Sequence, residues 1–240
     1  MKNFLKKLFL INSIKKIIGL KNYEKIKNFL RFHGIHFFRY KVNENISFGS
    51  EVLNDLFEKE LKSCKIYLEY GSGSSTLLAK KLNKNFFSIE GDKDFFRYMS
   101  KKISSEKLIL KSLGIVKHFC IPIDMEFDVC SEKLITIKRK KQIEQYTNEI
   151  LQFFEKINLT PDFILVDGRY RVLCGIYLYK FFKNKDVSFK IIFDDYMNRP
   201  YYHWLEKLFV IEKIGRFGVA TKIKKDVKNI DTSHYFRDCR

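Results

Sequence analysis

Apolar runs alternate with segments of helical periodicity from residue 51 to the C-terminal region. Short runs rich in Ile, Leu, Val, Phe and Tyr predict five strands: Lys65–Tyr70, Asn85–Glu90, Ile115–Pro122, Asp162–Asp167 and Ser188–Asp194. Apolar positions at helical spacing between and after them predict five helices: Ser74–Leu82, Lys93–Ser104, Lys141–Ile157, Arg171–Lys183 and Pro200–Phe209. Two final strands, Val210–Ile214 and Gly218–Lys224, are separated by a very short turn.

Strands that alternate with helices and are apolar along their length are typical of a parallel sheet covered on both faces. The short final turn predicts an antiparallel edge. The predicted fold class is therefore α/β, with a doubly wound, mostly parallel seven-stranded sheet, a C-terminal antiparallel hairpin, helices on both faces and an N-terminal helical extension. We predict two parts: residues 1–50 as a basic helical extension and residues 51–240 as the main domain.

The N-terminal segment carries an excess of lysine and arginine and an apolar stripe at helical spacing. Phe4, Leu8, Ile11, Ile14 and Ile18 share one face of a predicted helix. One interpretation is a helix within residues 1–20 that makes peripheral contact with an anionic membrane surface. The other is a helical extension packed on the domain, and the sequence leaves both open.

The composition bears on whether the protein binds nucleic acid, contains disulfides or spans a membrane. The formal net charge is +18, but lysine greatly outnumbers arginine, and no arginine-rich cluster or RNA-binding aromatic signature is present, which argues against a nucleic-acid partner. The five cysteines include no C-x-x-C pair and indicate reduced thiols. No apolar run reaches the length of a membrane span. We therefore expect a cytoplasmic protein, peripheral at the inner face of the membrane if residues 1–20 bind lipid.

The stretch from Tyr67 to Asp92, "YLEYGSGSSTLLAKKLNKNFFSIEGD", carries the clearest sign of a ligand. Gly71 and Gly73 follow the first predicted strand, and their lack of Cβ permits a tight turn and the close approach of a ligand. Ligands of doubly wound sheets bind beyond the carboxyl ends of the strands. Glu90 ends the second strand, where its carboxylate can accept hydrogen bonds from ribose hydroxyls. This spacing predicts a nucleoside site.

The identity of the nucleoside depends on the turn. The dinucleotide fingerprint is G-x-G-x-x-G, whereas "GSGSST" has Thr76 at its third position, and Glu69 at the mouth of the turn would repel a pyrophosphate but favour a cation. "EYGSG" together with Glu90 resembles the first motif of the class I S-adenosylmethionine-dependent methyltransferases, and the resemblance extends over about residues 60–225.

That resemblance implies S-adenosylmethionine as cofactor and a role for each matching residue. Glu69 would interact with the methionine ammonium through the turn backbone or water, and Gly71 and Gly73 would pass under the methionine part. Glu90 would hold the ribose, and Asp124, just after the third strand, would meet the adenine amine.

The ends of the fourth and fifth strands carry the candidate acceptor chemistry. "VDG" and "FDDY" resemble small-molecule and sugar O-methyltransferases, in which matching acids hold a divalent cation. The resemblance implies Mg²⁺ at Asp167, Asp194 and Asp195. Oxygen ligands suit this ion, which would lower the pKa of an acceptor hydroxyl and orient it.

Arginines near these acids support a different interpretation. Arg169 and Arg171 follow Asp167 directly, and two cations there would weaken an ion site by charge repulsion. These arginines could instead hold an anionic acceptor such as a carboxylate or phosphate. With Arg199 they could also neutralise the three acids without a metal, so the sequence leaves ion and arginine arrangements open.

His203 is a further candidate, because it follows the fifth strand and could act as a general base. It could equally pack a helix against the core. The predicted catalytic set is thus Asp167, Asp194, His203 and Arg169. The insertion Met125–Gln145 is long for a connection and could form part of an acceptor lid or a solvated face.

The sequence predicts S-adenosylmethionine-dependent methyl transfer to a small-molecule or sugar/glycan acceptor, at oxygen. Two rivals remain at this stage. One is a protein that binds the cofactor without turnover. The other is a nucleic-acid methyltransferase that uses the basic surface.

Overall fold

The computed structural model describes residues 40–104, 116–120 and 137–224, together with Val227, Ile230, Thr232 and Tyr235. The chain divides into two compact units, and the one formed by residues 41–124 and 130–240 contains every described residue except Tyr40. The predicted N-terminal helix, Asp124 and the first part of the 125–145 insertion lie outside the described residues.

The described part of the larger unit contains one seven-stranded sheet in the order β3-β2-β1-β4-β5-β7-β6. Its strands are β1 (Ile66–Tyr70), β2 (Asn85–Glu90), β3 (Val116–Cys120), β4 (Phe163–Val166), β5 (Lys190–Phe193), β6 (Phe209–Ile214) and β7 (Phe217–Ile223). Strands β1 to β5 pair in parallel, whereas β7 pairs antiparallel with both β5 and β6. The prediction of a mostly parallel sheet closed by an antiparallel hairpin is confirmed.

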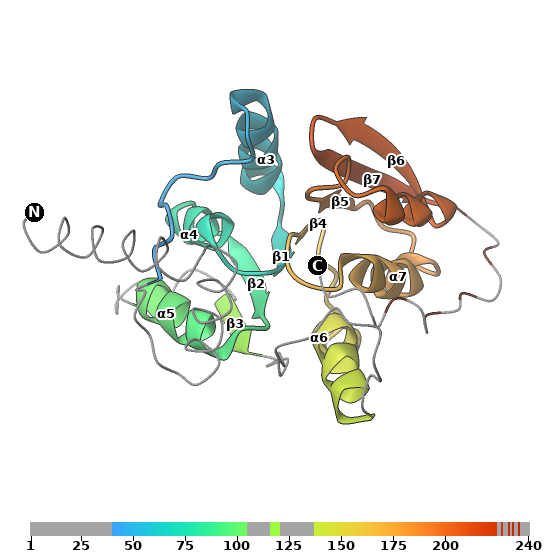
Figure 1. Cartoon of the computed structure of the whole chain (residues 1–240), viewed down its shortest axis with the longest axis horizontal. Coiled ribbons are helices and arrows are strands. Elements are labelled where there is room, and N and C mark those ends of the chain that lie inside the picture. The colour runs from blue at the N-terminus through green and yellow to red at the C-terminus, as the bar shows by residue number, and fades with distance from the viewer. Residues whose placement is uncertain are drawn as a thin grey trace, which may run out of the picture. The chain divides into compact units, whose positions relative to one another are not determined.

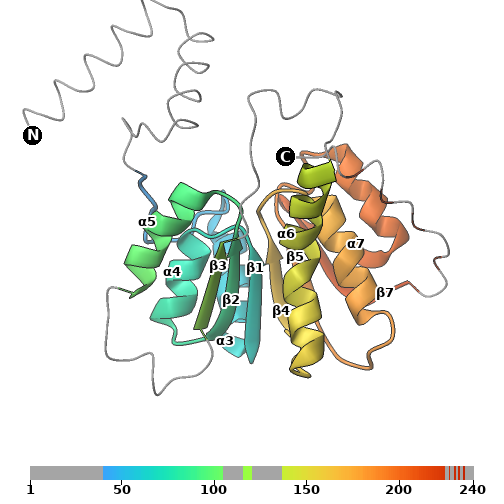
Figure 2. The same cartoon turned by 90° about the horizontal axis from the view of Figure 1, so that it is seen from below.

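Helices cover both faces of this sheet (Figure 1 and Figure 2). They are α3 (Glu51–Ser63), α4 (Ser74–Lys81), α5 (Lys93–Ser104), α6 (Ile137–Lys156), α7 (Arg171–Phe182) and the 3-10 helix η1 (Pro200–Lys207). In Figure 2, α4 and α5 lie on one side of the strands and α6 and α7 on the other.

Alternate side chains of the strands explain the two layers. Tyr67 of β1 contacts Phe57 of α3, with ring centroids 6.0 Å apart, whereas Tyr70 contacts Tyr146 of α6 on the opposite face at the same centroid separation. Because successive side chains of a strand point to opposite faces, an apolar run without polar interruptions fills two cores at once. This is why the strands read as continuous hydrophobic runs.

The main differences from the expected elements are at helices. Helix α3 was missed: Ser50 accepts a hydrogen bond from the backbone N–H of Leu53 at 3.3 Å and caps it, and Leu53, Phe57 and Leu61 are buried on one side. Helix α6 begins earlier than predicted, within the 125–145 insertion, and the last predicted helix is a 3-10 helix.

Candidate functional site

The turn after β1 is shaped by a close approach of backbone. Gly71 has φ +94°, and a Cβ there would lie 2.8 Å from the backbone of Gly168, in the turn after β4. Gly73, by contrast, is extended, and a Cβ there would meet no atom of the described residues within 4 Å. Gly71 is therefore required by the packing of two turns, whereas Gly73, which is not in the lining of the cavity described below, is not.

Glu69 is linked to this turn through the hydroxyl of Thr76. The Thr76 hydroxyl donates to the Glu69 carboxylate and accepts from the backbone N–H of Gly73 at 2.9 Å. The hydroxyl is thus shared between the motif acid and the turn, which orders the start of α4. A glycine at this position would remove both bonds, so the departure from G-x-G-x-x-G has a structural reason.

The Glu69 side chain itself is fully buried and lies outside the cavity lining. It also accepts from the hydroxyls of Tyr67 at 2.8 Å and Ser75 at 2.6 Å. Burial raises the pKa of Glu69, and these hydroxyl groups offset part of that rise. The expected link between Glu69 and a cofactor would therefore have to pass through the turn that it orders.

Glu90 connects the turns that follow β1 and β2. Its carboxylate accepts from Ser72 twice, from the backbone N–H at 3.1 Å and from the hydroxyl at 2.8 Å, and from the backbone N–H of Asp92 at 2.8 Å. The side chain is 8% exposed, and burial raises its pKa. Glu90 is therefore held rigidly at the carboxyl end of the sheet.

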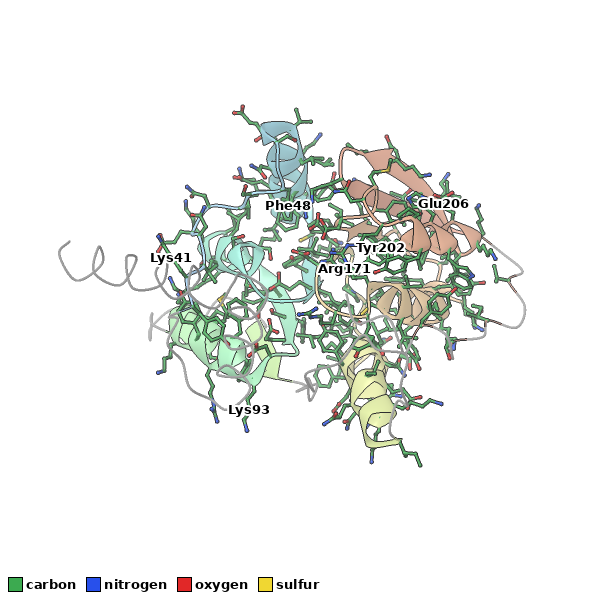
Figure 3. All side chains as sticks on the ribbon, viewed as in Figure 1. Lys41, Phe48, Lys93, Arg171, Tyr202 and Glu206 are labelled. Carbon is green, nitrogen blue, oxygen red and sulfur yellow. The ribbon has the colours of Figure 1, made fainter. Side chains whose placement is uncertain are left out.

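A cavity of about 370 Å³ opens at this edge of the sheet, a volume within the range of small-molecule sites. It joins the β1 turn to the turns after β4 and β5. Its lining consists of Gly71, Ser72, Glu90, Tyr146, Asp167, Gly168, Arg169, Arg171 and Arg199. Figure 3 shows Arg171 and Tyr202 side by side near the centre of the unit, and the Arg171 guanidinium lies 6.0 Å from the Tyr202 ring centroid.

The acidic pair after β5 is held by arginines. Asp194 is 2% exposed, and its two carboxylate oxygens each lie 2.7 Å from a nitrogen of Arg216, in the turn between β6 and β7. Asp195, which has φ +55°, also contacts Arg216 and lies 3.2 Å from Arg199. Asp194 is therefore paired from the hairpin side, and Asp195 is paired from both the hairpin and the segment before η1.

Arg171 joins this pair to Asp167. The guanidinium donates to the backbone carbonyls of Gly168 at 3.0 Å, Asp167 at 3.1 Å and Asp194 at 2.7 Å. It also lies 2.9 Å from the Asp167 carboxylate and 3.4 Å from that of Asp195. The side chain is almost entirely buried, so Arg171 fixes the turns after β4 and β5 relative to each other.

Asp167 is the acid of this cluster that borders the cavity. Its side chain is 39% exposed, yet the surrounding protein and the nearby Asp194 raise its pKa from 3.8 to about 8, against the opposing effect of Arg171. A carboxyl group with such a pKa changes protonation near neutral pH.

The three acids do not fit the divalent cation that the resemblance implied. Their carboxylates are engaged by Arg171, Arg199 and Arg216, which bring positive charge to the positions that an ion would take. Within the described ranges, no group of three or more His, Cys, Asp or Glu side chains is arranged to hold a metal ion. The suggested Mg²⁺ ligands Asp167, Asp194 and Asp195 therefore form an arginine–carboxylate cluster instead.

The structure brings only some of the predicted site residues together. Gly71, Glu90, Asp167 and Arg169 line the cavity. His203 lies in η1 against the ring of Tyr196, with ring centroids 4.9 Å apart, and is not part of the lining. This contact fits the helix-packing alternative for His203, and its role as a general base stays a prediction.

Two contributors escaped the sequence analysis. Tyr146 of α6 lines the cavity, and its hydroxyl accepts from the backbone N–H of Arg169 at 3.3 Å. Arg216 belongs to the hairpin turn, far along the chain from the acids that it binds. The short turn was recognised in the sequence, but the antiparallel pairing of β5 with β7, which delivers Arg216 to Asp194, was not.

Comparisons with known proteins are informative for the fold. No family model matches the chain, and no curated protein matches it. Among solved structures, a methyltransferase-like protein from Silicibacter pomeroyi is similar, with a TM-score of 0.63 and 20% sequence identity over 82% of this chain and 100% of the other. At this identity the likeness shows a shared fold.

Proposed function

We propose that the protein transfers a methyl group from S-adenosylmethionine to an oxygen atom of a small-molecule or sugar/glycan acceptor. The observation that carries this proposal is the pairing of Glu90 with Ser72 across the carboxyl ends of β2 and β1. It supports a nucleoside site, because a carboxylate that already accepts two bonds from the turn is held in position to accept ribose hydroxyls as well.

The residues beside this pair fit a sulfonium cofactor better than a dinucleotide. Among the described residues the space next to Gly73 is open. Two buried acidic side chains lie at this turn: Glu69 bonds to Thr76 of α4, and Glu90 bonds to Ser72 just before the helix. Acidic groups at these positions disfavour a pyrophosphate, which binds to the free N–H groups and positive end of a helix. When bound, S-adenosylmethionine would supply an electrophilic methyl group.

The chain's own contribution to the chemistry is positioning and proton transfer. Arg171 holds the Asp167 carboxylate at 2.9 Å and fixes its orientation at the border of the cavity. In its ionised form, which becomes populated as the pH rises through a pKa of about 8, Asp167 can accept the proton of an acceptor hydroxyl, as a general base does. The rigid turns after β4 and β5 hold the acceptor site in place, which accounts for much of the catalysis of a displacement reaction.

A transfer assay tests this proposal. The full chain is incubated with S-adenosylmethionine carrying a deuterated methyl group and with a panel of sugars, sugar acids and phenols, and products are identified by mass spectrometry. We expect a labelled methyl ether or ester with at least one acceptor, and its loss in Asp167→Asn. Cofactor binding without any methylated product would favour the non-catalytic binding protein, and label in added RNA or DNA would favour the nucleic-acid enzyme.

A further inference from the structure

Arginine dominates the charge around the cavity. Arg169, Arg171 and Arg199 belong to its lining, together with the carboxylates of Glu90 and Asp167. The three arginines come from the turn after β4, the first turn of α7 and the segment before η1. The turn after β4 with the start of α7, and the segment before η1, therefore both place guanidinium groups at one cavity.

Arg216 changes the balance of this cluster. It engages both oxygens of Asp194 and also contacts Asp195, so Asp194 has a cationic partner outside the cavity lining, while Asp195 is shared with Arg199 and Arg171. The cavity lining alone contains three arginines (Arg169, Arg171 and Arg199) against two carboxylates (Glu90 and Asp167). One positive charge is therefore in excess within the lining, whereas outside it Arg216 lies against the two carboxylates of Asp194 and Asp195.

Arg171 and Arg199 are also held by the protein in advance of any ligand, and the backbone of Arg169 is held as well. Three backbone carbonyls and the Asp167 carboxylate fix Arg171. Arg199 lies with its guanidinium 5.7 Å from the Tyr202 ring centroid, a cation–π distance. The backbone N–H of Arg169 donates to the Tyr146 hydroxyl at 3.3 Å while its side chain is exposed at the cavity. Such planar, preorganised guanidinium groups match carboxylate and phosphate oxygens.

We propose that the methyl acceptor carries an oxyanion, a carboxylate or a phosphate, and that Arg169 and Arg199 bind it, with Arg171 as the fixed positive charge that joins them to the acidic pair. This inference rests on the proposed function and specifies its acceptor. Sugar acids and sugar phosphates are the class that combines such an anion with a free hydroxyl for methylation.

The test is an NMR titration that follows the Nε–H signals of the arginine side chains. Inorganic phosphate and acetate are added separately to the full chain, once alone and once saturated with S-adenosylhomocysteine, so that the two arms distinguish phosphate from carboxylate. Arg169→Gln and Arg199→Gln are compared with Arg97→Gln, which removes an exposed arginine of α5 that is not in the cavity lining.

We expect one of the two anions to bind the protein saturated with S-adenosylhomocysteine. Arg169→Gln and Arg199→Gln should each lower the affinity for that anion about tenfold or more, the effect of one charged hydrogen bond. Arg97→Gln should leave the affinity unchanged. Equal affinities in all variants, or no anion binding, would overturn the inference. So would displacement of the anion by S-adenosylhomocysteine, because the arginines would then serve the cofactor's own carboxylate. The same titration separates the two proposals, since failure of S-adenosylhomocysteine to bind contradicts the proposed function, whereas anion binding that depends on Arg169 supports the anion site.

Discussion

At the scale of single residues, the hydroxyl of Thr76 orders the turn after β1. Thr76 donates to Glu69 and accepts from the N–H of Gly73, so its hydroxyl links the motif acid to the turn. Thr76 therefore has a structural role at the position where the dinucleotide-binding fingerprint G-x-G-x-x-G has its third glycine.

Thr76→Val keeps the shape of the side chain but removes both hydrogen bonds. Because Glu69 is buried and loses a donor, we expect the free energy of unfolding to fall by about 1–3 kcal/mol, measured by urea denaturation, and S-adenosylhomocysteine affinity to fall with it. Thr76→Ser should restore both properties, and Thr221→Val, at an exposed position of β7, should change neither. An unchanged stability of Thr76→Val would show that the shared hydroxyl does not order the turn.

The raised pKa of Asp167 predicts that the stability of the fold falls as the pH rises. Its pKa in the folded protein is raised from 3.8 to about 8, so between these values the folded state binds more protons than the unfolded state. The contribution of this group to stability is therefore present at low pH and is lost as the pH rises through the folded pKa.

Urea denaturation at pH 5, 7 and 8.5 compares the wild type with Asp167→Asn. We expect the stability of the wild type, relative to that of the variant, to decline between pH 5 and pH 8.5, by a modest amount because the side chain is 39% exposed. A difference between the two proteins that is constant across this range would show that Asp167 titrates at an ordinary value.

At the scale of elements, the hairpin of β6 and β7 does more than close the sheet. Its turn places Arg216 against Asp194, which is almost completely buried at the end of β5. An unpartnered carboxylate at such a position is costly. The hairpin is therefore coupled to the acidic end of the site.

Arg216→Gln tests this coupling. We expect a loss of about 2–4 kcal/mol in the free energy of unfolding, because Asp194 would keep its burial while losing its bidentate partner. The double variant Arg216→Gln with Asp194→Asn should recover part of the loss. Lys213→Gln, which removes only a surface ion pair with Glu206, should cost less than about 1 kcal/mol. A loss in Arg216→Gln no larger than in Lys213→Gln would contradict the account.

The sequence was most informative about elements and least about their side-chain partners. Apolar periodicity predicted β2 and α5 at their observed bounds, because these patterns follow directly from burial. Helix α3 was not predicted, although Ser50 at its N-cap and the helical spacing of Leu53, Phe57 and Leu61 are signals that indicate it. The contact of Arg216 with Asp194 depends on strand pairing between distant segments, which local sequence patterns do not report.

At the scale of the whole molecule, the strand order β3-β2-β1-β4-β5-β7-β6 brings the ends of β1, β2, β4 and β5 to one edge of the sheet. The cavity at this edge is lined from three of the connecting turns as well as from α6. Within the part of the chain that the structure describes, no helix has the length and apolarity needed to cross a bilayer. The predicted contact of residues 1–20 with a membrane surface remains a prediction.

The most direct test of the central claim is calorimetry of S-adenosylhomocysteine binding to the full chain, beside Glu90→Gln and the control Glu212→Gln on an exposed position of β6. We expect the wild type to bind. The Glu90→Gln substitution removes the charge but keeps the shape of the side chain, so we expect it to weaken the binding free energy by about 1.5–3 kcal/mol, the range for hydrogen bonds to a charged group. Glu212→Gln should leave the affinity unchanged. Absence of binding to the wild type, equal affinity in Glu90→Gln, or tighter binding of NADPH than of S-adenosylhomocysteine would contradict it.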